Sequence, residues 1–180
     1  MSVLPAPSAF VIDLLDLGRR AGSMVQADRT IPAPEDLGIA VIGVPQESDL
    51  DLIVKVEAVE QGVLVTGSVH ADLVGECVRC LDELTDEVSL PFQELFFYAD
   101  QVLEGDDEEF LRLEDDRVDL EPVVRDVIVT ALPLRPLCRE DCPGLCSECG
   151  ARLADDPTHD HQIIDARWAA LLNVQTQDEQ

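Results

Sequence analysis

Two runs of alternating apolar and polar residues, joined by a glycine turn, most constrain the fold of this chain. In residues 52–58, apolar side chains occupy most second positions, and residues 63–73 repeat this pattern after Gln61-Gly62. Period-two alternation places apolar side chains on one face of a β-strand, and a glycine between two such runs favours an antiparallel hairpin. A third alternating run follows at residues 88–93. The sequence therefore predicts an antiparallel meander and not a βαβ series.

One helix is predicted after these strands. Apolar residues recur at helical spacing between residues 120 and 131, Asp119 precedes them as a candidate cap, and Pro133 and Pro136 follow them. This arrangement is typical of an amphipathic helix with a defined beginning and end. Packed on one face of a sheet built from residues 38–97, the helix would complete an α+β fold.

The N-terminal third of the chain has weaker patterns. Residues 8–17 fit either a strand or a short helix, and residues 18–34 are predicted to form a loop because Pro32 and Pro34 interrupt them. Residues 38–44 are predicted to form a short apolar strand. Four aromatic residues gather within residues 92–98, without neighbouring cations, and are expected to pack in the core.

The charge of the chain is strongly negative. Its 180 residues include 38 acidic and 12 basic side chains, which gives a formal net charge of −26. This balance argues against a protein that coats nucleic acid with basic patches. Residues 99–121 alone contain eleven acids, and such a run is expected to form a solvated loop over residues 99–118, with a binding surface for cations as the alternative.

Six cysteines provide the strongest chemical signal. They form two groups, Cys77-x2-Cys80 and Cys138-x3-Cys142-x3-Cys146-x2-Cys149. No basic n-region or apolar h-region of a signal peptide begins the chain, so these thiols are expected to be metal ligands in the cytoplasm and not disulfides. The spacing predicts a structural zinc site, because a tetrahedral zinc ion takes four thiolates.

Three ligand sets are compatible with the spacing. The local set of Cys138, Cys142, Cys146 and Cys149 is preferred, because short loops cost the least entropy to close. The pair Cys77/Cys80 could instead join Cys146/Cys149, as in a zinc ribbon, or join Cys138/Cys142 across the fold. Two histidines, His159 and His161, are expected to be solvated, with a mixed site as the alternative.

Other function classes find less support. No segment has the ~20 uncharged apolar residues that cross a bilayer. There is no glycine-rich phosphate loop, nucleophile elbow or zinc-protease helix, so we expect no enzyme and no small-molecule substrate. The chain is expected to divide into an α+β domain, residues 1–133, and a cysteine-rich zinc-binding segment, residues 134–180, which ends in a short helix around residues 164–172.

The order of these motifs resembles the YceD family of large ribosomal RNA subunit accumulation proteins. The resemblance runs from about residue 9 to residue 173 and rests on residues 75–81, on the helix that leads to Cys138, on the second cysteine group, and on residues 165–171. It implies a noncatalytic bacterial protein required for normal accumulation or processing of large-subunit rRNA.

The implied partners follow from the charge and from the resemblance together. The leading hypothesis is contact with basic ribosomal proteins or with the large-subunit precursor. A direct rRNA-binding zinc module is the alternative, and its candidate contacts are the arginines near the cysteines, Arg79, Arg135, Arg139 and Arg152. A thiol oxidoreductase or a nuclease comes third.

Overall fold

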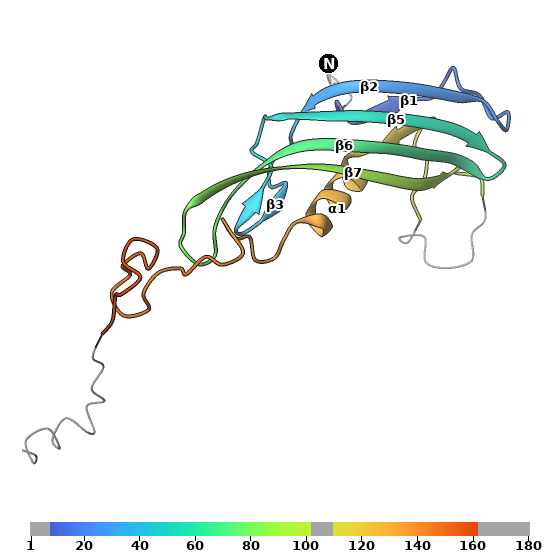
Figure 1. Ribbon diagram of the computed structural model, residues 1–180. Coiled ribbons are helices and arrows are strands. Elements are labelled where there is room, and N and C mark those ends of the chain that lie inside the picture. Colours follow the sequence, from blue (N-terminus) through green and yellow to red (C-terminus); the bar gives the residue numbers. More distant parts are fainter. Residues whose placement is uncertain (1–7, 102–109, 162–180) are drawn as a thin grey trace, which may run out of the picture.

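The computed structural model describes residues 8–101 and 110–161 and shows a long, curved antiparallel sheet with a helix against one face (Figure 1). The elements in chain order are β1 (Val11–Asp13), β2 (Met24–Pro32), β3 (Gly38–Ile39), β4 (Ile42–Gly43), β5 (Asp49–Val59), β6 (Gly62–Glu76), β7 (Glu83–Phe97), β8 (Arg117–Asp119) and α1 (Glu121–Ala131). The predicted antiparallel sheet with one helix, an α+β arrangement, is confirmed.

Strand β6 is the centre of the larger sheet. It pairs with β7 along one edge, and its other edge pairs first with β5 and then with the short β4. Strand β2 extends the sheet beyond β5, and β3 pairs with β4. The meander β5–β6–β7 therefore has the register that the alternating runs predict, with Val56 opposite Val65 and Val65 opposite Glu94.

The core lies between the sheet and α1. Alternate residues of β5 are buried, as the period-two pattern requires, and Val65 and Val69 of β6 are fully buried. Helix α1 contributes Val123, Val124 and Ile128 to the same core. The aromatic cluster also packs as expected, and its buried members are Phe92, Phe96 and Tyr98.

The helix begins and ends close to the predicted residues. Leu120 is the N-cap residue, and the carboxylate of Asp119 accepts a hydrogen bond of 3.0 Å from the backbone N–H of Glu121. Helical conformation ends at Ala131, two residues before Pro133. A proline disfavours helical conformation in the residue before it, which explains this end.

Two predicted loops contain strands. Residues 18–34 include β2, which pairs with β5 over its whole length, so the predicted loop is wrong there. As an edge strand with most side chains exposed, β2 needs no apolar alternation. The predicted acidic loop at residues 99–118 is also too long, because β8 begins at Arg117 and pairs with β1. Residues 102–109 of that segment, and the terminal helix expected around residues 164–172, lie outside the described residues.

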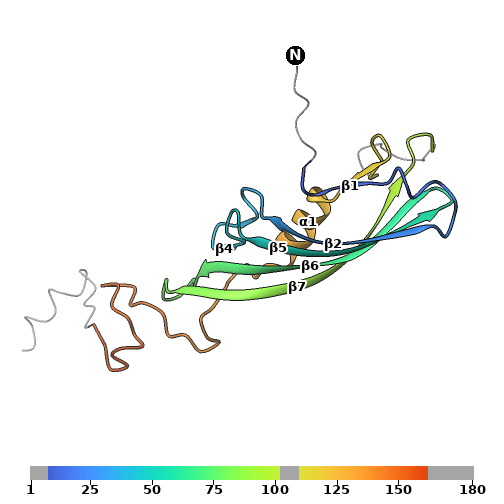
Figure 2. The same ribbon diagram turned by 90° about the horizontal axis from the view of Figure 1, so that it is seen from above.

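The cysteine-rich segment and the residues that precede β8 lie far apart. Figures 1 and 2 show residues 132–161 beyond the turn between β6 and β7, whereas residues 110–116 lie at the opposite end of the sheet. The cysteines and residues 110–116 thus belong to separate regions of the surface. Among the described residues, no helix combines the length and the apolar character needed to cross a bilayer.

Replacing Ile128 with alanine is expected to lower the free energy of unfolding by about 2–5 kcal/mol, because the vacated volume lies in a close-packed core. The Ile128 side chain has 0% exposure. Urea unfolding of the full chain measures the loss. The control is Asp126→Ala on the exposed side of α1, for which a change within about 0.5 kcal/mol is expected. Equal losses for both variants would show that α1 does not pack as described.

Candidate metal centre

Cys77, Cys80, Cys138 and Cys142 come together at one end of the sheet. Cys77 and Cys80 lie in the turn between β6 and β7, and Cys138 and Cys142 lie in the segment that follows α1. Their four sulfur atoms lie within 4.8 Å of one another. We call this group the first cysteine cluster.

Backbone hydrogen bonds hold the two segments of the first cysteine cluster together. The N–H of Val78 donates to the carbonyl of Pro136 at 3.0 Å, and the N–H of Leu145 donates to the carbonyl of Arg79 at 3.1 Å. Gly144 has a φ of +81°, and a Cβ there would lie 3.0 Å from the Arg79 carbonyl oxygen. Glycine therefore permits both the turn and the close approach of the two segments.

The sulfur–sulfur distances in the first cysteine cluster fit the ligands of one ion. The Cys77 and Cys142 sulfurs lie 3.8 Å apart, and the Cys80 and Cys138 sulfurs lie 3.6 Å apart. Ligands at a metal–sulfur distance of about 2.3 Å in a tetrahedron are separated by about 3.8 Å. All six cysteines are free thiols. The first cysteine cluster therefore has the composition and spacing to hold a metal ion.

The four thiols of the first cysteine cluster differ in acidity. The pKa of Cys77 is lowered to about 6, chiefly because the backbone N–H of Cys138 hydrogen-bonds its sulfur. The pKa of Cys80 is raised to about 12, first by burial and then by the hydrogen bond with Cys77. A hydrogen bond with Cys142 raises the pKa of Cys138. The Cys77 thiolate thus forms readily and disfavours ionisation of the neighbouring thiols. A bound dication would instead favour the thiolate form of all four cysteines.

The remaining two cysteines lie in a second group with two histidines. Cys146, Cys149, His159 and His161 each offer a ligand atom within 4.8 Å of the others. The sequence predicts solvated histidines, with a mixed site as the alternative, and the structure places both histidines beside the two cysteines. The sequence signal for this group is the His-x-His spacing shortly after Cys149. That spacing alone does not distinguish two metal ligands from two solvated loop histidines.

The structure does not bring the preferred local set together. Cys138 and Cys142 lie with Cys77 and Cys80, and Cys146 and Cys149 lie with the histidines. Of the three ligand sets, the one that crosses the fold matches this geometry. The long loop between Cys80 and Cys138 costs little entropy to close at the metal site, because backbone hydrogen bonds already hold the two segments together. The first cysteine cluster spans the expected boundary at residues 133 and 134.

Three of the four candidate RNA-contacting arginines are bound within the chain. The Arg79 guanidinium donates to the Cys142 carbonyl at 2.9 Å and also to the Glu140 carbonyl. Arg139 pairs with Asp141 at 3.3 Å, and Arg152 pairs with Asp82. Arg135 is exposed. The arginines therefore lie near the first cysteine cluster, but acidic side chains or carbonyl groups surround most of them.

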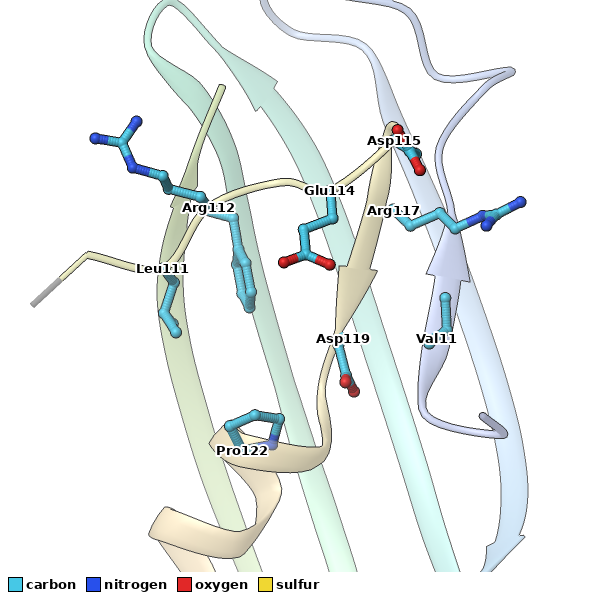
Figure 3. A pocket seen from close by; sticks show the side chains of 9 residues that line it. Val11, Leu111, Arg112, Glu114, Asp115, Arg117, Asp119 and Pro122 are labelled. Atoms are coloured by element: carbon cyan, nitrogen blue, oxygen red, sulfur yellow. The ribbon is translucent and has the colours of Figure 1, made fainter. Parts of the chain in front are cut away.

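A pocket of mixed character lies at the other end of the molecule (Figure 3). Its lining includes Phe96, Glu114 and Asp119, together with Arg112 and Arg117. Figure 3 shows the Glu114 carboxylate directed into the space, whereas the Arg112 and Arg117 side chains extend away from it. The lining holds three carboxylates, Glu114, Asp115 and Asp119, against two arginines, so it favours cationic over anionic ligands.

Comparison with known proteins identifies the family of this chain. The family described as Large ribosomal RNA subunit accumulation protein YceD matches residues 65–175, more than half of the chain. The chain belongs to the YceD family. The matched residues contain all four cysteines of the first cysteine cluster and also Cys146, Cys149, His159 and His161.

Curated relatives of this YceD protein come from mycobacteria. Uncharacterized proteins of Mycobacterium bovis and Mycobacterium tuberculosis are 42% identical over 169 residues, which cover 93% of this chain and 82% of theirs. An uncharacterized protein of Mycobacterium leprae is 36% identical over 173 residues, covering 95% of this chain and 80% of its own. No solved structure matches this YceD protein.

Proposed function

We propose that this YceD protein is a noncatalytic factor in large ribosomal subunit biogenesis. It would support the accumulation and processing of large-subunit rRNA by binding basic ribosomal proteins or the precursor particle. The observation that carries the proposal is the family match over residues 65–175. The net charge of −26 selects the kind of partner, because a negative field attracts basic proteins and repels naked rRNA.

The surroundings of the arginines support a protein partner over direct rRNA binding. Residues 134–161 contain three arginines and six acids. Arg139 and Arg152 are each paired with an acid, and Arg79 is engaged by two carbonyl groups. A phosphate would have to compete with these partners. The direct rRNA-binding module therefore remains the second candidate.

The first cysteine cluster is proposed to bind zinc as a structural brace. Four thiol groups at tetrahedral spacing are a typical zinc donor set. When bound, the ion would cross-link the β6–β7 turn to the segment after α1, through Cys77 and Cys80 on one side and Cys138 and Cys142 on the other. Four protein ligands leave no open position for a substrate or water.

The exposure of the thiols supports a role without thiol catalysis. Cys77 has the lowered pKa, but its side chain has 0% exposure, and Cys142 has 4%. A redox-active cysteine combines a lowered pKa with access to its substrate. In the first cysteine cluster, the acidic thiol is the inaccessible one.

Titration of the full chain with two ligands tests the proposed function. The ligands are a purified basic large-subunit protein and naked large-subunit rRNA, at about 0.15 M salt, where charges interact over roughly 8 Å. We expect the tighter, salt-sensitive binding with the protein. Tight binding to naked rRNA that is lost in Arg135→Ala/Arg139→Ala, with no binding to basic proteins, would support the second candidate instead.

A further inference from the structure

We propose that Cys146, Cys149, His159 and His161 bind a second zinc ion, separate from any ion in the first cysteine cluster. The two groups share no ligand. The second site would have two thiolates and two imidazoles as donors, a set that suits zinc and is chemically distinct from four thiolates. We call these four residues the Cys2His2 cluster.

The ring nitrogens of both histidines converge on one cysteine. The Nε2 atom of His159 and the Nε2 atom of His161 each lie 3.2 Å from the Cys149 sulfur. The two Nε2 atoms lie 2.9 Å apart. With Cys146 included, all four ligand atoms lie within 4.8 Å. Four donors from two chain segments thus face a common point, as they do around a tetrahedral ion.

The backbone around the cysteines forms a tight turn that presents both thiols on one side. The N–H of Gly150 donates to the carbonyl of Cys146 at 2.8 Å, and the N–H of Cys146 donates to the carbonyl of Ala151 at 2.8 Å. Gly150 has a φ of +71°, which glycine adopts without strain. This turn is the type that lets the two thiolates of a Cys-x2-Cys sequence reach one ion.

A second turn positions the histidines. The Asp156 carboxylate accepts hydrogen bonds from the N–H and the hydroxyl of Thr158, at 3.0 and 2.7 Å. The N–H of His159 donates to the Asp156 carbonyl at 3.1 Å. The two turns therefore fix the ligands of the Cys2His2 cluster from both sides.

No apolar core accounts for the fold of this segment. Every residue from 146 to 161 is exposed or only partly buried. Small units that cannot bury enough apolar surface depend on disulfides or metal ions for their stability. These cysteines are free thiols. A bound ion is the interaction that would hold the two turns together.

The test measures zinc per chain in the full-length protein, purified without chelator. The expected content is two zinc ions for the unaltered chain and one for His159→Ala/His161→Ala. The control is Gln93→Ala, because Gln93 is an exposed residue of β7 that belongs to none of the groups of possible metal ligands; its expected content is two. Equal zinc content in the unaltered chain and in the double histidine variant would overturn the proposal.

Three further measurements separate loss of ligands from loss of fold. His161→Cys restores a donor, so it is expected to keep two ions where His161→Ala keeps one. In the cobalt-substituted chain, His159→Ala/His161→Ala should lose the absorption of a mixed sulfur–nitrogen site and retain that of a four-sulfur site. Amide exchange should accelerate in residues 146–161 and stay unchanged in β5 and β6. If the two histidines bind only each other and no metal, then His159→Ala/His161→Ala changes no metal signal. That result would also overturn the proposal. None of these outcomes depends on binding to a ribosomal partner.

Discussion

Replacing Cys138 with serine is expected to release one zinc ion and to free residues 134–145 from the β6–β7 turn. Structural zinc contributes about 10–16 kcal/mol in small modules, and this energy is lost with the ion. The loss of a direct ligand should weaken zinc binding by more than the roughly 10–100-fold cost of changing an outer hydrogen-bond partner. The measurements are zinc per chain and amide exchange of residues 77–82 and 134–145.

The matched variant is Cys149→Ser, which makes the same chemical change at another exposed cysteine. It should also remove one ion, but accelerated exchange should be confined to residues 146–161. The double variant should contain no zinc, because the two changes affect separate clusters. If each single variant and the double variant all lose the same one ion, the four C-terminal cysteines form a single site, and the grouping described above is wrong.

Neutralising the acidic segment is expected to slow association with a basic large-subunit protein by about tenfold or more. The variant is Asp106→Asn/Asp107→Asn/Glu108→Gln/Glu109→Gln, which removes four negative charges from the densest acidic stretch of the chain. Complementary charge raises association rates by about 10–10³-fold at low ionic strength. Stopped-flow association at two salt concentrations measures the effect, and the variant should show the weaker salt dependence.

Amide substitution keeps side-chain size and avoids deleting residues of the fold. Leu113 is buried, and the N–H of Leu113 donates to the carbonyl of Phe97 at 2.9 Å. A deletion of residues 100–116 would remove this contact and confuse folding with binding. Substitution of residues 106–109 leaves it intact.

The control removes the same number of charges elsewhere. Four exposed glutamates of β6 and β7 are changed to glutamine: Glu76, Glu83, Glu87 and Glu94. If both four-charge variants slow association equally, only the net charge matters and the acidic segment is not a specific surface. If neither variant changes the rate, the proposed electrostatic partnership fails.

The sequence alone determined the central meander and the helix. Alternation in β5 and β6, with the turn at Gly62, gives the register directly, because a slip of one residue would turn every apolar side chain outward. Helical spacing and Pro133 located α1. The cysteine spacing also indicated candidate metal ligands, and all six cysteines lie in groups that could hold a metal ion.

Only the tertiary structure determined which strands pair and which cysteines lie together. Strand β2 has no alternating pattern, and pairing with β5 defines it. Strand β8 lies in an acidic stretch, and its pairing with β1 is equally nonlocal. The grouping of the cysteines is also nonlocal. Sequence distance favoured a local set of four, but the hydrogen bonds that Val78 and Leu145 donate bring the β6–β7 turn to Cys138 and Cys142. Local patterns report the conformation of one segment, whereas a metal site depends on which segments the fold brings into contact.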